Sequence, residues 1–110
     1  MRQTAVPELT EPAAMLDELG STAQDVADAL RARGIKGVRN TVRFLNPIVR
    51  YAHTRVTDVY GIDLIQGDRL RIVFANGQVT EVVVPEPVLR FLDGFHRGDY
   101  PDLEMPVGPG

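Results

Sequence analysis

Apolar residues follow a helical period in the first third of the chain, beginning after Gly20. Ala23, Val26, Ala27 and Leu30 are spaced i, i+3, i+4 and i+7, which places them on one face of a helix. The pattern predicts an amphipathic helix over residues 21–33.

The two ends of this helix carry recognisable signals. Ser21 and Gln24 have the capping-box spacing, in which a hydroxyl accepts from the N3 amide and a glutamine reaches back. Gly34 is suited to the position after the last helical residue, where Ile35 can make the accompanying hydrophobic contact.

A second helical stretch is predicted to begin near Asn40 or Thr41 and to be interrupted at Pro47. Proline lacks an N–H and clashes with the preceding turn, so it is poorly tolerated inside a helix. Asn46-Pro47 therefore reads as an N-cap and first helical residue that restart a helix running to about His53. The residues expected to face the core are Ile48, Tyr51 and Ala52.

From Val56 onward the pattern changes to short strands rich in β-branched residues, expected at 59–65, 70–75 and 79–84. Turns are predicted at 66–68 and at Asn76-Gly77, the latter a two-residue type I′ turn. This turn predicts the pairs Phe74 with Val79 and Leu70 with Val83 on one face, with Glu81 beside Ile72.

A closing helix is predicted from Pro85-Glu86-Pro87 through Phe95, with Tyr100 and Leu103 anchoring the tail. The expected fold is α+β: two N-terminal helices, a three-stranded antiparallel meander and a C-terminal helix. Residues 1–20 are expected to be a leader, loose or forming a short docking helix with Met15, Leu16 and Leu19 on one side. Residues 21–105 form the single domain, and a disordered tail covers 106–110.

Composition fits one small globular domain of 110 residues, with 44% hydrophobic and 25% charged residues. The absence of cysteine excludes disulfides, thiolate metal sites and a cysteine nucleophile. No apolar run approaches the roughly 18 residues that span a bilayer, and the first residues lack an apolar signal core. We therefore expect a cytoplasmic protein.

The charge is strongly segregated along the chain. The stretch 29–57 has no acidic residue and seven basic ones, while the remainder has five basic and fifteen acidic ones. The basic residues of that stretch are Arg31, Arg33, Lys36, Arg39, Arg43, Arg50 and Arg55. Such polarity is typical of an interaction surface.

Parts of the chain resemble a group of short bacterial proteins, mainly actinobacterial, for which no activity is established. The resemblance lies in residues 26–40, including Gly34-Ile35-Lys36-Gly37-Val38-Arg39, and in Asn46-Pro47-Ile48-Val49-Arg50-Tyr51. It continues in an ending with Phe91, Phe95, Gly98, Tyr100, Pro101 and Leu103. Asn46 stands where many members have cysteine. The resemblance implies the element order and a bacterial origin.

Catalytic and metal-binding patterns fail on spacing. Residues 93–104 have the length of a calcium loop, but Phe95 and Arg97 occupy ligand positions. The Gly34–Gly37 turn lacks the phosphate-loop spacing, although its amides could hold an anion. A small enzyme using His96 with Asp99 or Asp102 is a remote alternative. No cofactor or small-molecule substrate is indicated.

The basic segment carries the functional hypotheses. Arg39 and Arg43 are spaced i, i+4 and would project from one side of a helix. The residues predicted to bind a partner are Arg31, Arg33, Lys36, Arg39, Arg43 and Arg50. We expect a non-enzymatic interaction or regulatory module that binds another protein or a second copy of itself. The alternative is a nucleic-acid-binding regulator that uses segment 31–55.

Overall fold

The structure is a computed structural model that describes residues 14–43 and 45–105. A short helix at residues 14–17 precedes α2 (Ala23–Ala32) and α3 (Pro47–Arg55). Three strands follow, β1 (Val59–Ile65), β2 (Arg69–Phe74) and β3 (Val79–Val83). The chain closes with α4 (Glu86–Arg97) and a 3-10 turn, η1 (Pro101–Leu103). The predicted α+β class with a three-stranded antiparallel sheet is confirmed.

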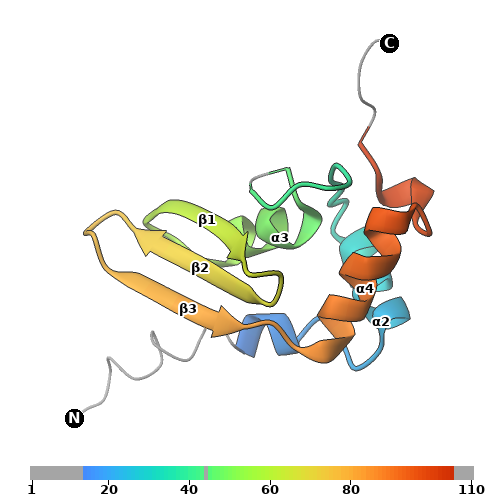
Figure 1. The fold of residues 1–110 in the computed structure, drawn as a ribbon, viewed down its shortest axis with the longest axis horizontal. Helices are drawn as coiled ribbons and strands as arrows, with labels where there is room; N and C mark the ends of the chain where they lie inside the picture. The colour runs from blue at the N-terminus through green and yellow to red at the C-terminus, as the bar shows by residue number, and fades with distance from the viewer. Residues whose placement is uncertain (1–13, 44, 106–110) are drawn as a thin grey trace.

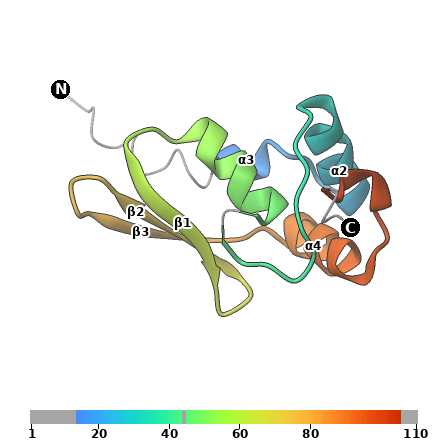
Figure 2. The ribbon, with the colours of Figure 1, turned by 90° about the horizontal axis from the view of Figure 1, so that it is seen from above.

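The sheet is a meander in the order β1-β2-β3, with helices on one side only. Figure 2 shows α3 over one face of the sheet, while α2 and α4 lie together beyond its end. No described helix lies against the opposite face. This arrangement leaves one whole sheet face and the outer edge of β3 uncovered within residues 14–43 and 45–105.

The core lies between the covered sheet face and the helices. It combines strand residues with apolar stripes from every helix, as amphipathic elements require. Tyr51, Phe91 and Phe95 are its largest fully buried side chains. Other members are Met15, Leu16, Leu19, Val26, Leu30, Ile48, Leu70, Ile72, Val88 and Leu103.

The predicted caps are largely correct. Asn46 Oδ1 accepts from the N–H groups of Ile48 and Val49 at 2.8 and 3.4 Å, so α3 starts at Pro47 as expected. Gly34 has φ +67°, and the N–H of Ile35 donates to Leu30 O at 3.0 Å, closing α2 as a Schellman motif.

The N-cap of α2 is one residue later than predicted. Thr22, not Ser21, accepts the N–H of Asp25. The carboxylate of Asp25 reaches back to the N–H of Ser21 at 3.2 Å. Asp25 therefore takes the place at N3 that we assigned to Gln24, but its carboxylate reaches one residue further back than in a capping box, to the residue before the N-cap.

The predicted helix from Asn40 or Thr41 is wrong. Residues 38–43 form turns, and Asn40 has φ +63°. One long-range and one local hydrogen bond fix this loop. Val42 O accepts from the distant Leu64 N–H at 2.8 Å, and Thr41 O accepts from the nearby Asn46 side chain at 2.8 Å. Arg39 and Arg43 are therefore not on one side of a helix.

The predicted register of the β2–β3 hairpin is wrong by one residue. Asn76 does not have positive φ, whereas Gly77 has φ +93°. Three residues, 75–77, form the loop, with Phe74 N–H donating to Gln78 O at 2.8 Å. This is the type I turn with a glycine bulge, which is the next most common hairpin connection.

The corrected register exchanges the two faces of β3, because a slip of one residue turns every side chain over. Arg71 now pairs with Glu81, and Leu70 pairs with Val82. Val82 is buried in the core, whereas Val83 points to the uncovered face. Glu81 also lies on the uncovered face and does not interrupt the core.

The tail after α4 is anchored as predicted. Leu103 is buried, and Tyr100 packs partly buried against the core. Gly37 forms a parallel bridge with Glu104, through Gly37 N–H to Leu103 O at 2.9 Å. Helix α4 runs to Arg97, two residues beyond the predicted end. The predictions for residues 1–13 and 106–110 lie outside the described residues.

Candidate interaction surfaces

The predicted basic segment is divided between different parts of the structure. Arg31, at the end of α2, contacts Asp28 at 2.7 Å and Asp102 at 2.5 Å. The hydrogen bond from Arg31 lowers the pKa of Asp102 and raises the pKa of Arg31. Arg31 therefore links α2 to the C-terminal tail, and its charge is already compensated.

Arg39 lies against the same tail. Its guanidinium is 3.9 Å from the carboxylate of Glu104. Beside it, the N–H of Asn40 donates to His96 Nδ1 at 2.8 Å. Burial lowers the pKa of His96, and Arg39 adds to this effect while Asp93 opposes it. The positive φ of Asn40 aims its amide at the imidazole.

The guanidinium groups of Arg33 and Arg55 both lie over the Tyr51 ring, 5.3 and 5.8 Å from its centroid. Arg55 also contacts Glu18 at 2.5 Å and lowers the pKa of that carboxyl group. Through these cation–π contacts and the ion pair with Glu18, the two arginines connect α2, α3 and the segment around Glu18.

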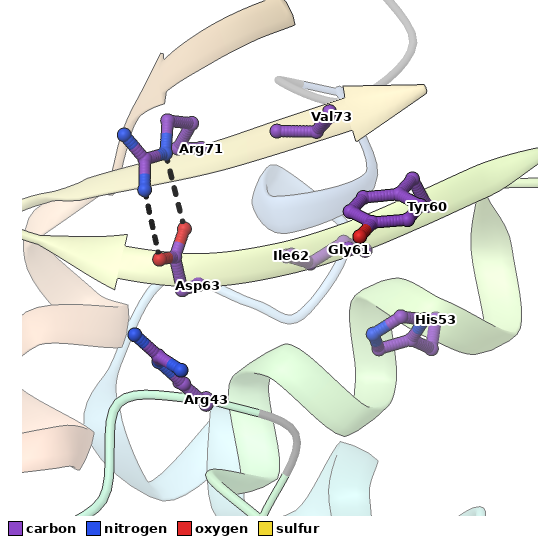
Figure 3. A pocket seen from close by; sticks show the side chains of 8 residues that line it. All are labelled: Arg43, His53, Tyr60, Gly61, Ile62, Asp63, Arg71 and Val73. Carbon is purple, nitrogen blue, oxygen red and sulfur yellow. Dashed lines mark hydrogen bonds and ion pairs between the residues drawn. The ribbon is translucent and has the colours of Figure 1, made fainter. Parts of the chain in front are cut away.

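The other predicted binding residues are scattered. Lys36 is exposed near Asp102, whose pKa it helps to lower. Arg50 is half-buried, and among the described residues its Nε has no hydrogen-bond partner. Arg43 lies apart from the rest, beside β1 (Figure 3). The structure thus brings Arg31, Lys36 and Arg39 to the C-terminal tail but does not assemble all six residues into one patch.

A pocket of about 390 Å³ lies at the edge of β1, between the strand, α3 and the loop that carries Arg43. Figure 3 shows Arg43 and His53 on one side and Tyr60, Asp63 and Arg71 on the other. Arg71 holds the Asp63 carboxylate through two contacts, at 3.1 and 3.3 Å. Sequence reasoning singled out only Arg43 of these residues, because the others come from separate segments that only the fold brings together.

The uncovered face of the sheet is the second surface. Val79 and Val83 of β3 are 55% and 69% exposed on this face, on either side of Glu81. Glu81 pairs with Arg69 of β2 at 3.4 Å. The sequence signal for this surface was the Val-rich strand itself, but the predicted register had placed Val79 and Val83 on the same face as Phe74 and Leu70.

The outer edge of β3 has free main-chain groups. Hydrogen-bonded and non-bonded pairs alternate in an antiparallel ladder. Phe74 N–H bonds to Gln78 O and Val84 N–H to Asp68 O, so the even-numbered residues of β3 bond to β2. The N–H and C=O groups of Val79, Glu81 and Val83 therefore point outward. Within the described part of the chain, no backbone group pairs with them.

The remote enzymatic arrangement is not assembled. Asp99 pairs with Arg97 at 2.8 Å and Asp102 pairs with Arg31, while His96 Nδ1 accepts from Asn40. No group of three or more acidic or histidine side chains in residues 14–43 and 45–105 is placed to hold a metal ion. In the same residues, no helix is long and apolar enough to cross a membrane.

Comparisons with family models, with curated proteins and with solved structures give no match to this chain.

Proposed function

We propose that this chain is a protein-interaction module that pairs with a second copy of itself through the outer edge of β3. The observation that supports this proposal is the row of outward N–H and C=O groups at Val79, Glu81 and Val83, which pair with no backbone group among residues 14–43 and 45–105. Such an edge is a template for strand addition. Proteins that stay monomeric protect long edges with lysine, proline or bulges, and β3 has none of these between its ends.

The edge is complementary to itself. An antiparallel pairing centred on Glu81 aligns Val79 of each copy with Val83 of the other. The outward main-chain groups of Val79, Glu81 and Val83 in one copy then lie opposite those of Val83, Glu81 and Val79 in the other. Each of these N–H groups can donate to a C=O group of the second copy. The result is a continuous six-stranded sheet with twofold symmetry, the commonest symmetry of homo-oligomers. The two exposed valines gain cross-strand apolar neighbours.

Charge at the centre of this pairing is balanced. Like charges directly opposite one another destabilise a strand pair, and Glu81 would face Glu81 of the second copy. Each carboxylate, however, already has Arg69 of its own chain at 3.4 Å. The four side chains then form a row across the uncovered face in the order Arg69, Glu81, Glu81 and Arg69, so that each of the two adjacent carboxylates keeps its own guanidinium partner.

Nucleic-acid binding through segment 31–55 is the second candidate. Its support is the charge asymmetry of the sequence. It is weakened by the ion pairs of Arg31, Arg39 and Arg55, because a compensated arginine contributes less to counterion release from a phosphate backbone.

Sedimentation equilibrium over a concentration series up to about 1 mM, where even a binding free energy of about 4 kcal/mol is detected, tests the homodimer. We expect a concentration-dependent dimer of the full chain. Among main-chain groups Glu81→Pro removes only an outward N–H, which an edge strand tolerates, and besides this it removes the exposed ion pair with Arg69. It should make the chain monomeric with an unchanged far-UV CD spectrum. A monomeric wild-type chain, or a Glu81→Pro chain that dimerises equally well, contradicts the proposal.

A charge exchange gives an independent measurement. Glu81→Lys places Lys opposite Lys in its own homodimer but opposite Glu81 in a mixed dimer. We therefore expect the variant to prefer the wild-type chain in native mass spectrometry of a mixture. Glu86→Lys is the matched control, because it makes the same change on α4, where Glu86 pairs only with Arg90 at 2.8 Å. It should form homodimers and mixed dimers in statistical proportion.

A further inference from the structure

The pocket beside β1 is built differently from the dimer edge and lies at the other side of the sheet (Figure 3). Its volume of about 390 Å³ falls in the range of small-molecule sites. Gly61 and the neighbouring Val73 give it an apolar floor, the mostly buried Ile62 contributes the edge of β1, and Tyr60, which is 84% exposed, stands at its rim. A compact organic ligand fits such a site better than a bare ion.

The charges around the pocket leave one cation without a carboxylate. Arg71 is neutralised by Asp63 through the two contacts given above. Arg43 has no ion pair or hydrogen bond with another side chain of the described residues, and Figure 3 shows its guanidinium directed toward the space in front of Asp63. Two guanidinium groups and one carboxylate therefore line the pocket, and the surplus of one positive charge matches a ligand with one negative charge.

Gly61 keeps the pocket open. A β-carbon at this position would have no heavy atom within 4 Å, and its φ is not in the left-handed region. The strand conformation therefore does not require glycine here. Gly61 adjoins the irregularity in the β1–β2 register between Val59 and Gly61, and glycine in a strand is common both at such irregularities and where a ligand approaches closely. A larger residue at this position would project into empty space.

We propose that this pocket binds a small organic monocarboxylate. Arg43 is the anchor for the carboxylate, since a guanidinium presents paired N–H donors to its two oxygens. Tyr60, Gly61, Ile62 and Val73 receive the apolar body. A dianionic phosphate is disfavoured, because its second charge would face Asp63 with no further unpaired cation among the described lining residues.

The test follows amide chemical shifts of the full chain during titration with benzoate. We expect saturable shifts centred on Gly61, Ile62 and His53, with a dissociation constant of about 1 mM or lower, as for a fragment of this size. Benzyl alcohol, which has the ring without the charge, should bind at least about tenfold more weakly, because the charge-assisted hydrogen bonds are lost. Inorganic phosphate should also bind more weakly.

Two variants examine the two halves of the site. Gly61→Val should fill the pocket and abolish the benzoate shifts, while the melting temperature is unchanged or raised because valine suits a strand. Arg43→Gln should weaken benzoate about tenfold, whereas Lys36→Gln removes one charge elsewhere and should leave the affinity unchanged.

Several results would overturn the proposal. They are the absence of saturable shifts, equal affinity for benzoate and benzyl alcohol, phosphate binding as tight as benzoate, and undiminished binding in Gly61→Val. None of these measurements depends on the dimer, since Glu81→Pro should bind benzoate as the wild type does.

Discussion

The hydroxyl group of Tyr51 donates a hydrogen bond to the carbonyl oxygen of Met15, at 3.1 Å, from a fully buried ring. The hydroxyl oxygen of Tyr51 also accepts a hydrogen bond from the guanidinium of Arg55 at 2.7 Å. One phenol therefore links α3 to the segment that brings Met15, Leu16 and Leu19 into the core. Met15 is itself buried, so without this bond its carbonyl oxygen would lose a hydrogen bond in the protein interior.

Tyr51→Phe should consequently lower the free energy of unfolding by about 1–3 kcal/mol, the usual cost of a buried polar group that loses its partner. Urea denaturation followed by circular dichroism measures this change. Tyr60→Phe is the matched control, because its ring is 84% exposed and such surface changes stay within about 0.5 kcal/mol. Equal stabilities of the two variants would contradict the role of the Tyr51 hydroxyl.

A second prediction concerns Gly37, where the loop after α2 passes against Pro47. A β-carbon on Gly37 would lie 2.5 Å from Pro47 Cδ and 2.7 Å from Leu45 O. Both neighbours are rigid, and Gly37 also bonds to Leu103 and Met105 through its backbone. Overpacking of this kind costs about 1–3 kcal/mol or more, so Gly37→Ala should strongly destabilise the fold.

Gly61→Ala provides the comparison for Gly37→Ala, since the same methyl group meets nothing within 4 Å there. Replacing glycine where alanine fits without strain stabilises by about 0.4–1 kcal/mol. Thermal unfolding should therefore show a lower melting temperature for Gly37→Ala and an unchanged or higher one for Gly61→Ala. The reverse order would show that the Gly37 loop can move away from Pro47.

The elements that sequence reasoning placed correctly depend on local signals. The bounds of β1 were predicted without error, and the starts of α3 and α4 were fixed by Asn46-Pro47 and by the Pro85-Glu86-Pro87 run. In each case the determining chemistry lies within a few residues. A missing N–H, a capping amide or a run of β-branched residues acts in the same way wherever the segment lies in the fold.

The errors arose where a distant contact decides between two local possibilities. Asn76-Gly77 is compatible with a two-residue turn and with a three-residue turn ending in glycine. The choice depends on whether Val82 and Val84 or Val79 and Val83 enter the core. Both faces of the strand carry two valines, and the charged Glu81 beside Ile72 was the one local sign against the predicted register. The loop at 38–45 likewise depends on bonds to Leu64 and His96, which no local period reveals.

The candidate sites show the same limit. The charge segregation drew attention to segment 31–55, but three of its arginines hold the chain together through Asp102, Glu104 and Glu18. The pocket beside β1 unites residues from four separate stretches of sequence. A sequence pattern could indicate Arg43 as basic, yet it could not indicate that Arg43 alone of these arginines faces an open apolar floor.

A third prediction follows from His96. Its folded-state pKa is lowered from the usual value of about 6.5, mainly by burial. The folded state thus binds a proton at this site less readily than the unfolded state does. The associated stability is present above pH 6.5 and is lost as the pH falls from about 6.5 through the lower, folded-state pKa.

Wild-type stability should therefore fall more steeply between pH 7.5 and 5.5 than that of His96→Gln, whose side chain does not titrate. Urea titrations of both chains at closely spaced pH values measure the difference, in which the contributions of other groups cancel. A parallel pH dependence of the two chains would show that His96 titrates normally and that its contact with Asn40 does not require the neutral ring.

The last prediction separates the two functional hypotheses at the basic segment. Arg31, Arg39 and Arg55 are engaged by carboxylates, and Arg43 is set apart beside β1, so few uncompensated cations remain to neutralise adjacent phosphates. We expect no binding to random duplex DNA at physiological salt in fluorescence anisotropy, and little at low salt. If the chain does bind phosphates, the logarithm of its affinity should fall linearly with the logarithm of the salt concentration.

If such binding is found and is abolished by Arg39→Glu with Arg43→Glu, but not by Glu81→Pro, the nucleic-acid hypothesis replaces the interaction module. If the Arg39→Glu and Arg43→Glu changes do not alter DNA binding, and only Glu81→Pro changes the assembly state, the arginines act within the fold and the partner binds at the sheet.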